Sequence, residues 1–119
     1  DMRAVRHMVD SEDPEVARRA RLALDMYVTR IIKYIGSYTA ELGGLDVITF
    51  TAGIGENDAD LRREVCERLL PFGVRINDEV NNQRFSAATT ISTDDSSVTV
   101  MVVPTNEELA IARQALTLI

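Results

Sequence analysis

Residues 46–57 read Asp-Val-Ile-Thr-Phe-Thr-Ala-Gly-Ile-Gly-Glu-Asn, and the expected secondary structure is clearest here. The β-branched and aromatic residues of 47–50 favour a buried strand, because such side chains fit a pleated surface. Gly53 and Gly55 allow tight or positive-φ backbone geometry, and Asn57 is a good N-cap for a helix that follows. The stretch therefore predicts a strand, a glycine-rich turn and a helix.

A turn of this kind can hold a nucleotide. Two positions without a Cβ let the main chain approach a ligand closely, and the free N–H groups of a new helix face an anion or a polar ring placed there. The same pattern is more often an ordinary connection between a strand and a helix, without a ligand. Taken alone, the turn leaves both a ligand site and a purely structural role open.

Composition and charge restrict the class of protein. A chain of 119 residues with 45% apolar residues is long enough for one compact domain. Because 19 acidic residues outnumber 13 basic ones and no basic cluster is interleaved with aromatics, nucleic acid is not an expected partner. The apolar runs are far shorter than the ~20 residues of a membrane helix, so no membrane partner is expected.

The cysteine count and the first residues favour a cytoplasmic protein and a fragment. Cys66 is the single cysteine and cannot form an internal disulfide, and no charged-then-apolar leader opens the sequence. The chain begins at Asp1 and soon enters a helical pattern, while strand candidates are few for an α/β sheet. We therefore expect part of the sheet to lie outside this sequence.

A long helix is expected before the central stretch. Asp13 is a candidate cap followed by Pro14 at the first helical position, and apolar residues recur at helical spacing as far as Leu42. Gly43 and Gly44 then end the helix. At ~1.5 Å per residue this helix is roughly 43 Å long. Its aromatic stripe is expected to pack in the core and consists of Tyr27, Tyr34 and Tyr38.

A second helix and further strands are expected after the turn. Leu61, Val65 and Leu69 share one helical face, and Cys66 beside them is expected to be a small buried residue without chemistry. Pro71 and Gly73 close this helix. Residues 74–76 form a short strand candidate, residues 77–85 have helical potential, and the β-rich segments 89–93 and 97–103 predict a hairpin or an adjacent pair.

A second turn from strand to helix follows the last strand. Pro104 ends the strand, and Thr105-Asn106-Glu107-Glu108 has the spacing of a capping box in which Thr105 caps the helix and Glu108 reaches back. In an open α/β sheet the two turns can open on the same edge, where ligands collect.

Together these stretches resemble the C-terminal portion of the acetate and propionate kinase family, members of the actin-like ATPase superfamily. The resemblance covers nearly the whole chain and is carried by five motifs: Asp1-Met2-Arg3, Lys33-Tyr34-Ile35-Gly36, Phe50 to Asn57, Ile91-Ser92-Thr93 and Pro104 to Arg113. It implies an α/β fold of the actin-like (ribonuclease H-like) type, with a mixed sheet flanked by helices. Residues 1–119 would then be the C-terminal part of the second, nucleotide-binding domain of a two-domain kinase.

The resemblance also implies an activity. The family transfers the γ-phosphoryl group of ATP reversibly to acetate or propionate with Mg²⁺, giving an acyl phosphate and ADP, and its members are homodimers. It implies nucleotide contacts from Asp1, Met2, Arg3, Gly53, Ile54, Gly55, Glu56 and Asn57, and an association of Glu107 with magnesium. The residues that bind the carboxylate and stabilise the transition state have no match here, so no catalytic residue is assigned. The chain alone is expected to be inactive.

Simpler interpretations remain beside these roles. Glu107 lies in the first turn of a helix, where an acidic residue stabilises the helix by roughly 0.3 to 1 kcal/mol without any metal. Glu56 and Asn57 equally fit first-turn and cap positions, and His7 fits a solvent-facing or helix-packing role. The alternative function is a non-catalytic nucleotide-binding or assembly module of actin-like ancestry that works through dimerisation.

Overall fold

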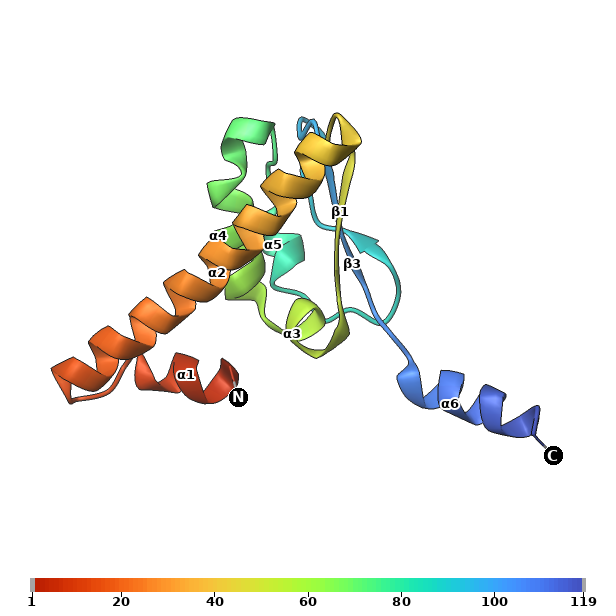
Figure 1. Cartoon of the computed structure of the whole chain (residues 1–119), viewed down its shortest axis with the longest axis horizontal. Coiled ribbons are helices and arrows are strands. Elements are labelled where there is room, and N and C mark those ends of the chain that lie inside the picture. Colours follow the sequence, from red (N-terminus) through yellow and green to blue (C-terminus); the bar gives the residue numbers. More distant parts are fainter. Residues whose placement is uncertain (1, 119) are drawn as a thin grey trace.

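A small mixed sheet and one long helix define the architecture of the computed structural model, which describes residues 2–118 (Figure 1). Along the chain the elements are α1 (Met2–Met8), α2 (Pro14–Leu42), β1 (Val47–Thr51), α3 (Ala52–Asn57), α4 (Ala59–Arg68), the 3-10 helix η1 (Leu70–Phe72), α5 (Asp78–Asn81), β2 (Thr89–Thr90), β3 (Thr99–Val103) and α6 (Glu107–Leu116). Asp1, one of the expected nucleotide contacts, lies outside the described residues. No helix within residues 2–118 is long and apolar enough to cross a bilayer.

The sheet has the strand order β1-β3-β2. β1 and β3 are parallel, in a register that pairs Val47 with Thr99 and Thr51 with Val103, while β2 is antiparallel to β3. The expected adjacency of the two late β-rich segments is confirmed, although β2 is only two residues long. The strand expected at 74–76 is reduced to a single bridge between Ile76 and Ser92.

The long helix α2 has the predicted start and end. The Asp13 carboxylate accepts hydrogen bonds from the N–H groups of Glu15 and Val16, at 2.9 and 3.3 Å. At the other end Gly43 adopts a left-handed conformation with φ of 74°, which lets its N–H and that of Gly44 bond to the last turn of the helix. These caps fix the length of the helix before any tertiary contact is considered.

One face of the sheet forms the core. Burial alternates along β1 and β3, so that Ile48, Phe50, Val100 and Val102 point inward. The helices α2 and α4 cover this face with a set of buried side chains that includes Val28, Leu61, Val65, Cys66 and Leu69. The predicted face of Leu61, Val65 and Leu69 is therefore confirmed, as is the burial of Cys66.

The aromatic stripe of α2 is only partly in the core, contrary to expectation. Tyr27 packs against the core cluster, but Tyr34 and Tyr38 are 50% and 59% exposed and contact each other at a ring centroid distance of 6.0 Å. Helical spacing gives the direction of these rings, yet the residues described here place no sheet or helix over them.

Two helix caps also differ from the sequence prediction. The N-cap of α4 is Asp58, whose carboxylate accepts from the Leu61 N–H, and Asn57 is instead the last residue of α3. The N-cap of α6 is Asn106, whose Oδ1 accepts from the N–H of Leu109 at 2.9 Å. The predicted capping box of Thr105 and Glu108 was therefore wrong, because Asn106 takes the role of the cap.

The molecule is more extended than a compact domain of its length. Its radius of gyration is 16.7 Å, against about 13.5 Å expected for a compact chain of this size. Figure 1 shows the reason: the paired helices α1 and α2 project on one side and α6 projects at the other end. The apolar residues of α6 are exposed, including Ile111 at 66% and Leu116 at 71%.

Candidate nucleotide site

Two turns meet at the C-terminal edge of the sheet, as the sequence indicated. β1 and β3 are parallel and end at the same level, where Thr51 pairs with Val103 and its hydroxyl donates to the Val103 carbonyl oxygen at 2.8 Å. α3 leaves the sheet directly after β1 and packs against β3 as well. The segment from Pro104 into α6 leaves directly after β3. In open α/β sheets this edge is where ligands bind.

The glycine-rich turn expected after β1 is instead the short helix α3, and its backbone differs from the expected geometry. The residue with positive φ is Ala52, at 59°, and neither Gly53 nor Gly55 has positive φ. A left-handed alanine costs roughly 1–2 kcal/mol, so the surrounding contacts hold it there. Gly55 is buried against the preceding strand, where an added Cβ would lie 3.1 Å from the carbonyl carbon of Phe50. Its lack of a side chain thus serves packing.

Gly53 has a different environment. Apart from its chain neighbours and the backbone of its own helix, no atom lies within 4 Å of the place its Cβ would occupy, and its φ is not in the left-handed region. Neither packing nor backbone conformation therefore explains a glycine at this position. The open space beside it belongs to a cavity, and a glycine there leaves room for a ligand to approach the main chain.

The cavity joins the two segments that were expected to contact a nucleotide. It holds about 670 Å³, the size of a small-molecule site, and lies between the first turn of α1 and the turn that follows β1. Met2 and Arg3 line it from one side, and Gly53, Ile54 and Asn57 from the other. Five of the eight expected nucleotide residues are thus brought to one place.

Glu56 does not line this cavity. Its Oε1 accepts hydrogen bonds from the backbone N–H and the hydroxyl of Thr105, at 2.8 and 2.9 Å. These two bonds, together with one from the Ala52 N–H, lower the pKa of the Glu56 carboxyl below its ordinary value. Glu56 therefore ties the first turn to the second.

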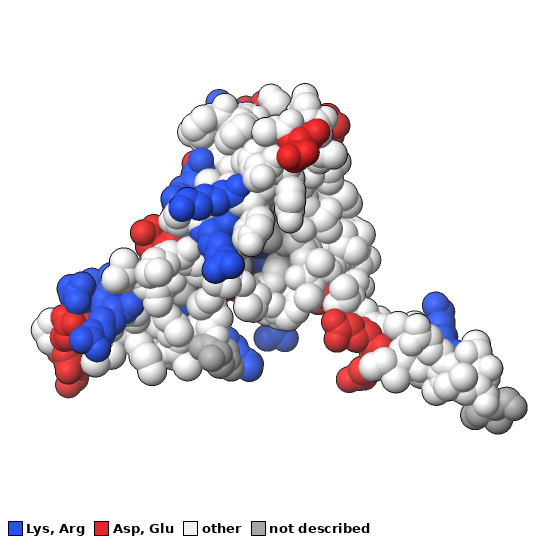
Figure 2. Space-filling model, in the orientation of Figure 1, with Lys and Arg blue, Asp and Glu red and all other residues white. Residues whose placement is uncertain are grey.

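Glu107 lies in the first turn of α6, two residues beyond Thr105, and is exposed. Figure 2 shows the acidic side chains at the start of this helix. No cluster of three or more His, Cys, Asp or Glu residues among residues 2–118 could hold a metal ion by itself. A lone exposed carboxylate still fits Mg²⁺, which keeps several waters and commonly binds one or two carboxylates together with substrate phosphates.

An ion-pair cluster holds α1, and with it Met2 and Arg3, next to α4. Arg6 donates to the carboxylate of Asp58 at 2.9 Å and to that of Glu64 at 3.3 Å. Burial alone would lower the pKa of Arg6, but the two carboxylates outweigh burial and raise it. Because Asp58 also caps α4, this carboxylate connects the wall formed by α1 to the turn.

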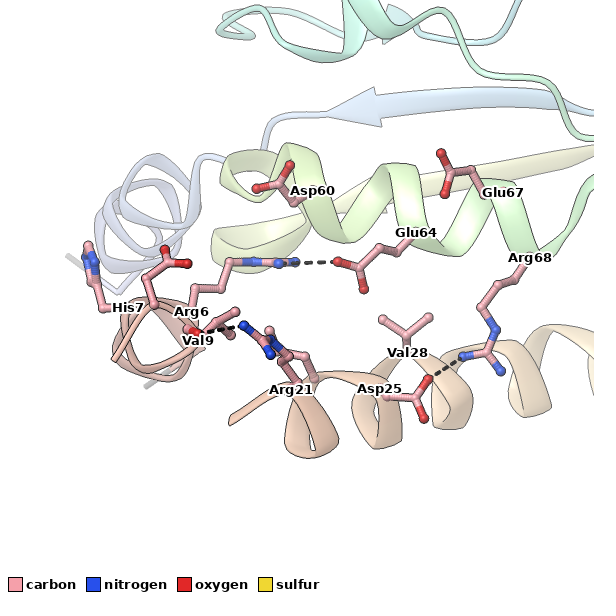
Figure 3. A pocket seen from close by; sticks show the side chains of 12 residues that line it. Arg6, His7, Val9, Arg21, Asp25, Val28, Asp60, Glu64, Glu67 and Arg68 are labelled. Carbon is pink, nitrogen blue, oxygen red and sulfur yellow. Dashed lines mark hydrogen bonds and ion pairs between the residues drawn. The ribbon is translucent and has the colours of Figure 1, made fainter. Parts of the chain in front are cut away.

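A second cavity of about 690 Å³ lies between α1, α2 and α4 (Figure 3). Charged side chains of both signs line it, and they pair across the gap: Arg6 with Glu64 and Arg68 with Asp25. His7 lines both cavities and is exposed, as one of its expected roles required. Since four of its charged side chains are used by these two internal pairs, this second cavity fits a gap between helices better than a nucleotide site.

Sequence reasoning missed Arg62, although it is among the most buried side chains. Arg62 is 1% exposed and donates to the carbonyl oxygens of Gly55 and Glu56 within the turn. A signal was present: Arg62 stands three and four residues before the buried Val65 and Cys66, which places a charged residue on the inner side of α4.

The comparisons with known proteins agree with this architecture. The model of the acetokinase family matches residues 1–113. An acetate kinase of Leifsonia xyli subsp. xyli is 55% identical over 98% of this chain, and one of Alkaliphilus metalliredigens is 50% identical over 92% of it. This chain spans only 28% and 29% of the length of these two relatives.

Solved structures give the same result. The acetate kinase of Entamoeba histolytica matches with a TM-score of 0.87 at 30% identity, over 99% of this chain and 30% of the other. The acetate kinase of Porphyromonas gingivalis matches with a TM-score of 0.80 at 39% identity, over 98% of this chain and 28% of the other. The expected actin-like α/β fold is confirmed, and the chain belongs to the acetokinase family.

Proposed function

We propose that this chain supplies the nucleotide side of the active site of a carboxylate kinase, as the C-terminal part of its second, nucleotide-binding domain. The enzyme would transfer the γ-phosphoryl group of ATP reversibly to acetate or propionate, giving an acyl phosphate and ADP. The names of the relatives support this proposal, since they are acetate kinases and one matching structure is a propionate kinase of Francisella tularensis. Because the chain spans under a third of their length, the remaining site residues would come from other parts of the protein.

One observation carries the proposal: Met2 and Arg3 line the same cavity as Gly53, Ile54 and Asn57. In our account the adenosine lies in this cavity. Gly53 offers unobstructed main chain, Ile54 offers apolar surface to the base, and Arg3 offers a planar cation suited to a phosphate or to stacking on the ring. Gly55 and Glu56 would contribute indirectly: Gly55 packs against β1, and Glu56 accepts hydrogen bonds from Thr105.

We assign Glu107 as the residue that would hold Mg²⁺, through its carboxylate or through water. The tie between Glu56 and Thr105 keeps this carboxylate near the edge of the sheet where the nucleotide turn lies. Bound Mg²⁺ neutralises charge on the phosphates during transfer. The donor set fits, since a hard cation prefers oxygen ligands.

We also infer a partner surface and a location. The exposed apolar residues of α6 and the exposed Tyr34 and Tyr38 of α2 are surfaces that the rest of the kinase or a second subunit would cover, in line with a homodimer. A cytoplasmic location fits substrates that are metabolites. Both the partner surface and the location are proposed for the full-length kinase.

The test uses the full-length protein and measures acyl phosphate formation from Mg-ATP with acetate or propionate, trapped with hydroxylamine. Gly53→Val fills the open space in the cavity, and we expect the KM for ATP to rise about tenfold or more while the acceptor KM changes by less than about twofold. Gly44→Val is the matched control, because this glycine also has open surroundings but precedes β1, at the end of that strand opposite Gly53.

The outcomes separate the two candidate functions. Acyl phosphate formation that Gly53→Val impairs through the ATP KM supports the kinase. Nucleotide binding without acyl phosphate formation would favour the non-catalytic module. Full activity with an unchanged ATP KM in Gly53→Val would contradict the assignment of this cavity.

A further inference from the structure

Arg62 occupies an unusual position for a charged residue. It lies on α4, its side chain is 1% exposed, and the groups that it contacts are neutral. Burial lowers the pKa of its guanidinium, and the nearby Asp58 carboxylate offsets part of that effect. An arginine nevertheless stays charged in a protein, so its donors must be satisfied inside the structure.

Two of the four hydrogen bonds that the Arg62 guanidinium donates go to backbone carbonyls of α3. Nη1 donates to the carbonyl oxygens of Gly55 and Glu56, at 2.8 and 2.9 Å. These carbonyls belong to the last residues of α3, where a helix end leaves carbonyl groups without partners in the helix. Arg62 supplies those partners from a different helix and so fixes where α3 ends.

The other half anchors Arg62 to a separate element. Nε donates to the Asn81 side-chain oxygen and Nη2 to the Asn81 carbonyl oxygen, both at 2.7 Å. Asn81 is itself fully buried, and its side chain donates to the carbonyl oxygen of Ala59 at 2.9 Å. The guanidinium also lies 5.2 Å from the centre of the Phe85 ring. The planar fork therefore bridges α3 to α5 with a rigid geometry.

We propose that Arg62 is a positioning residue for nucleotide binding, which holds the end of α3 so that Gly53, Ile54 and Asn57 face the cavity. This inference rests on the proposed nucleotide role of that cavity. α3 begins at Ala52, which has an unfavourable left-handed conformation. Hydrogen bonds from Arg62 to the other end of α3 stabilise this segment, and Arg62 does not line the cavity itself. Stability alone does not require such a residue, because apolar side chains of similar volume commonly serve a buried position as well.

The experiment compares variants of the full-length protein. Arg62→Lys keeps the charge but cannot bridge the turn and Asn81 together, and Arg62→Met keeps the length without any donor. Val98→Ala is the matched control: Val98 is 1% exposed and immediately precedes β3, at the end of the sheet opposite the turn. For each variant we would measure Tm, the KM for ATP, the KM for the carboxylate, and hydrogen exchange over residues 52–58.

We expect Arg62→Lys to raise the ATP KM about tenfold or more, to leave the acceptor KM within about twofold, and to speed exchange over residues 52–58. Val98→Ala should lower Tm without changing the ATP KM. An unchanged ATP KM in Arg62→Lys would overturn the proposal, as would an equal rise in Val98→Ala. Loss of folding in both Arg62 variants would also overturn it, since Arg62 would then serve the fold as a whole.

The same experiment keeps the two proposals apart. If the unsubstituted protein forms no acyl phosphate, the kinase assignment fails. Hydrogen exchange over residues 52–58 still tests the role of Arg62 in that case, because this measurement needs no enzyme activity. Unchanged exchange there would mean that Arg62 does not hold the turn.

Discussion

Glu56 and Thr105 are 49 residues apart in sequence, and the carboxylate of the first accepts hydrogen bonds from both the backbone N–H and the hydroxyl of the second. Glu56 belongs to the turn after β1, and Thr105 to the segment after β3. The contact therefore ties the segment that leads to Glu107 to α3, which borders the cavity proposed to hold the nucleotide. A single side chain couples the two parts of the proposed site, which the sequence presents as separate motifs.

Removal of this contact should weaken binding of the magnesium nucleotide. With Glu56→Ala we expect the KM for Mg-ATP to rise about three- to tenfold, because Thr105 and the following Glu107 lose their attachment to the turn. The measurement is the ATP KM at several Mg²⁺ concentrations. Glu41→Ala, an exposed carboxylate at the end of α2, is the control. Equal KM values for the two variants would contradict the coupling.

The same contact should depend on pH in a defined direction. Its two donors hold the pKa of Glu56 below the ordinary value of 4.5, so the contact stabilises the fold fully above that value and is lost as the pH falls through the lower pKa of the folded state. The difference in Tm between the wild type and Glu56→Gln should thus be present at neutral pH and vanish in acid. A difference in Tm that grows as the pH falls would contradict the lowered pKa of Glu56.

Arg6 should hold α1 in place. Arg6→Met removes its bonds to Asp58 and Glu64, and we expect a loss of about 1 kcal/mol in the free energy of unfolding together with faster proteolysis between residues 2 and 12. Arg18→Met is the control. Arg18 pairs with Glu15 on an exposed surface, where such pairs contribute little. Urea titration gives the free energy of unfolding of both variants. An equal loss in the two would show that Arg6 is an ordinary surface residue.

Cys66 should be unreactive in the folded protein. Burial raises the pKa of its thiol to about 12, so the thiol stays protonated at pH 8 and cannot act as a nucleophile. Iodoacetamide should label it slowly under native conditions and rapidly in urea. Rapid labelling of the native protein would mean that α4 opens, or that the core around Val65 is less tightly closed than the structure indicates.

Local signals predicted much of this fold. The strand at 47–51 and the helix from Pro14 to Leu42 depend on propensity, caps and periodicity, which act within a few residues. The turn expected at 53–57 was wrong, since these residues belong to the short helix α3. Contacts between distant residues explain the errors. Asn106 caps α6 in place of Thr105, which contacts the distant Glu56 instead, and the exposure of Tyr34 depends on which other elements cover α2.

The candidate site divides in the same way. The resemblance named the residues, and the structure places five of them around one cavity. Periodicity could not identify the contacts of Arg62, because its partners are backbone carbonyls and an asparagine 19 residues away. Backbone acceptors leave no residue-type signal in a sequence, so a support of this kind appears only once the fold is known.

Hydrogen exchange of the full-length protein with and without ADP shows whether this cavity holds the nucleotide. If the cavity between α1 and the turn after β1 holds the nucleotide, ADP should slow exchange in residues 2–9 and 52–58 together and leave residues 70–85 unchanged. Protection of neither segment, with ADP bound elsewhere on the protein, would contradict the account.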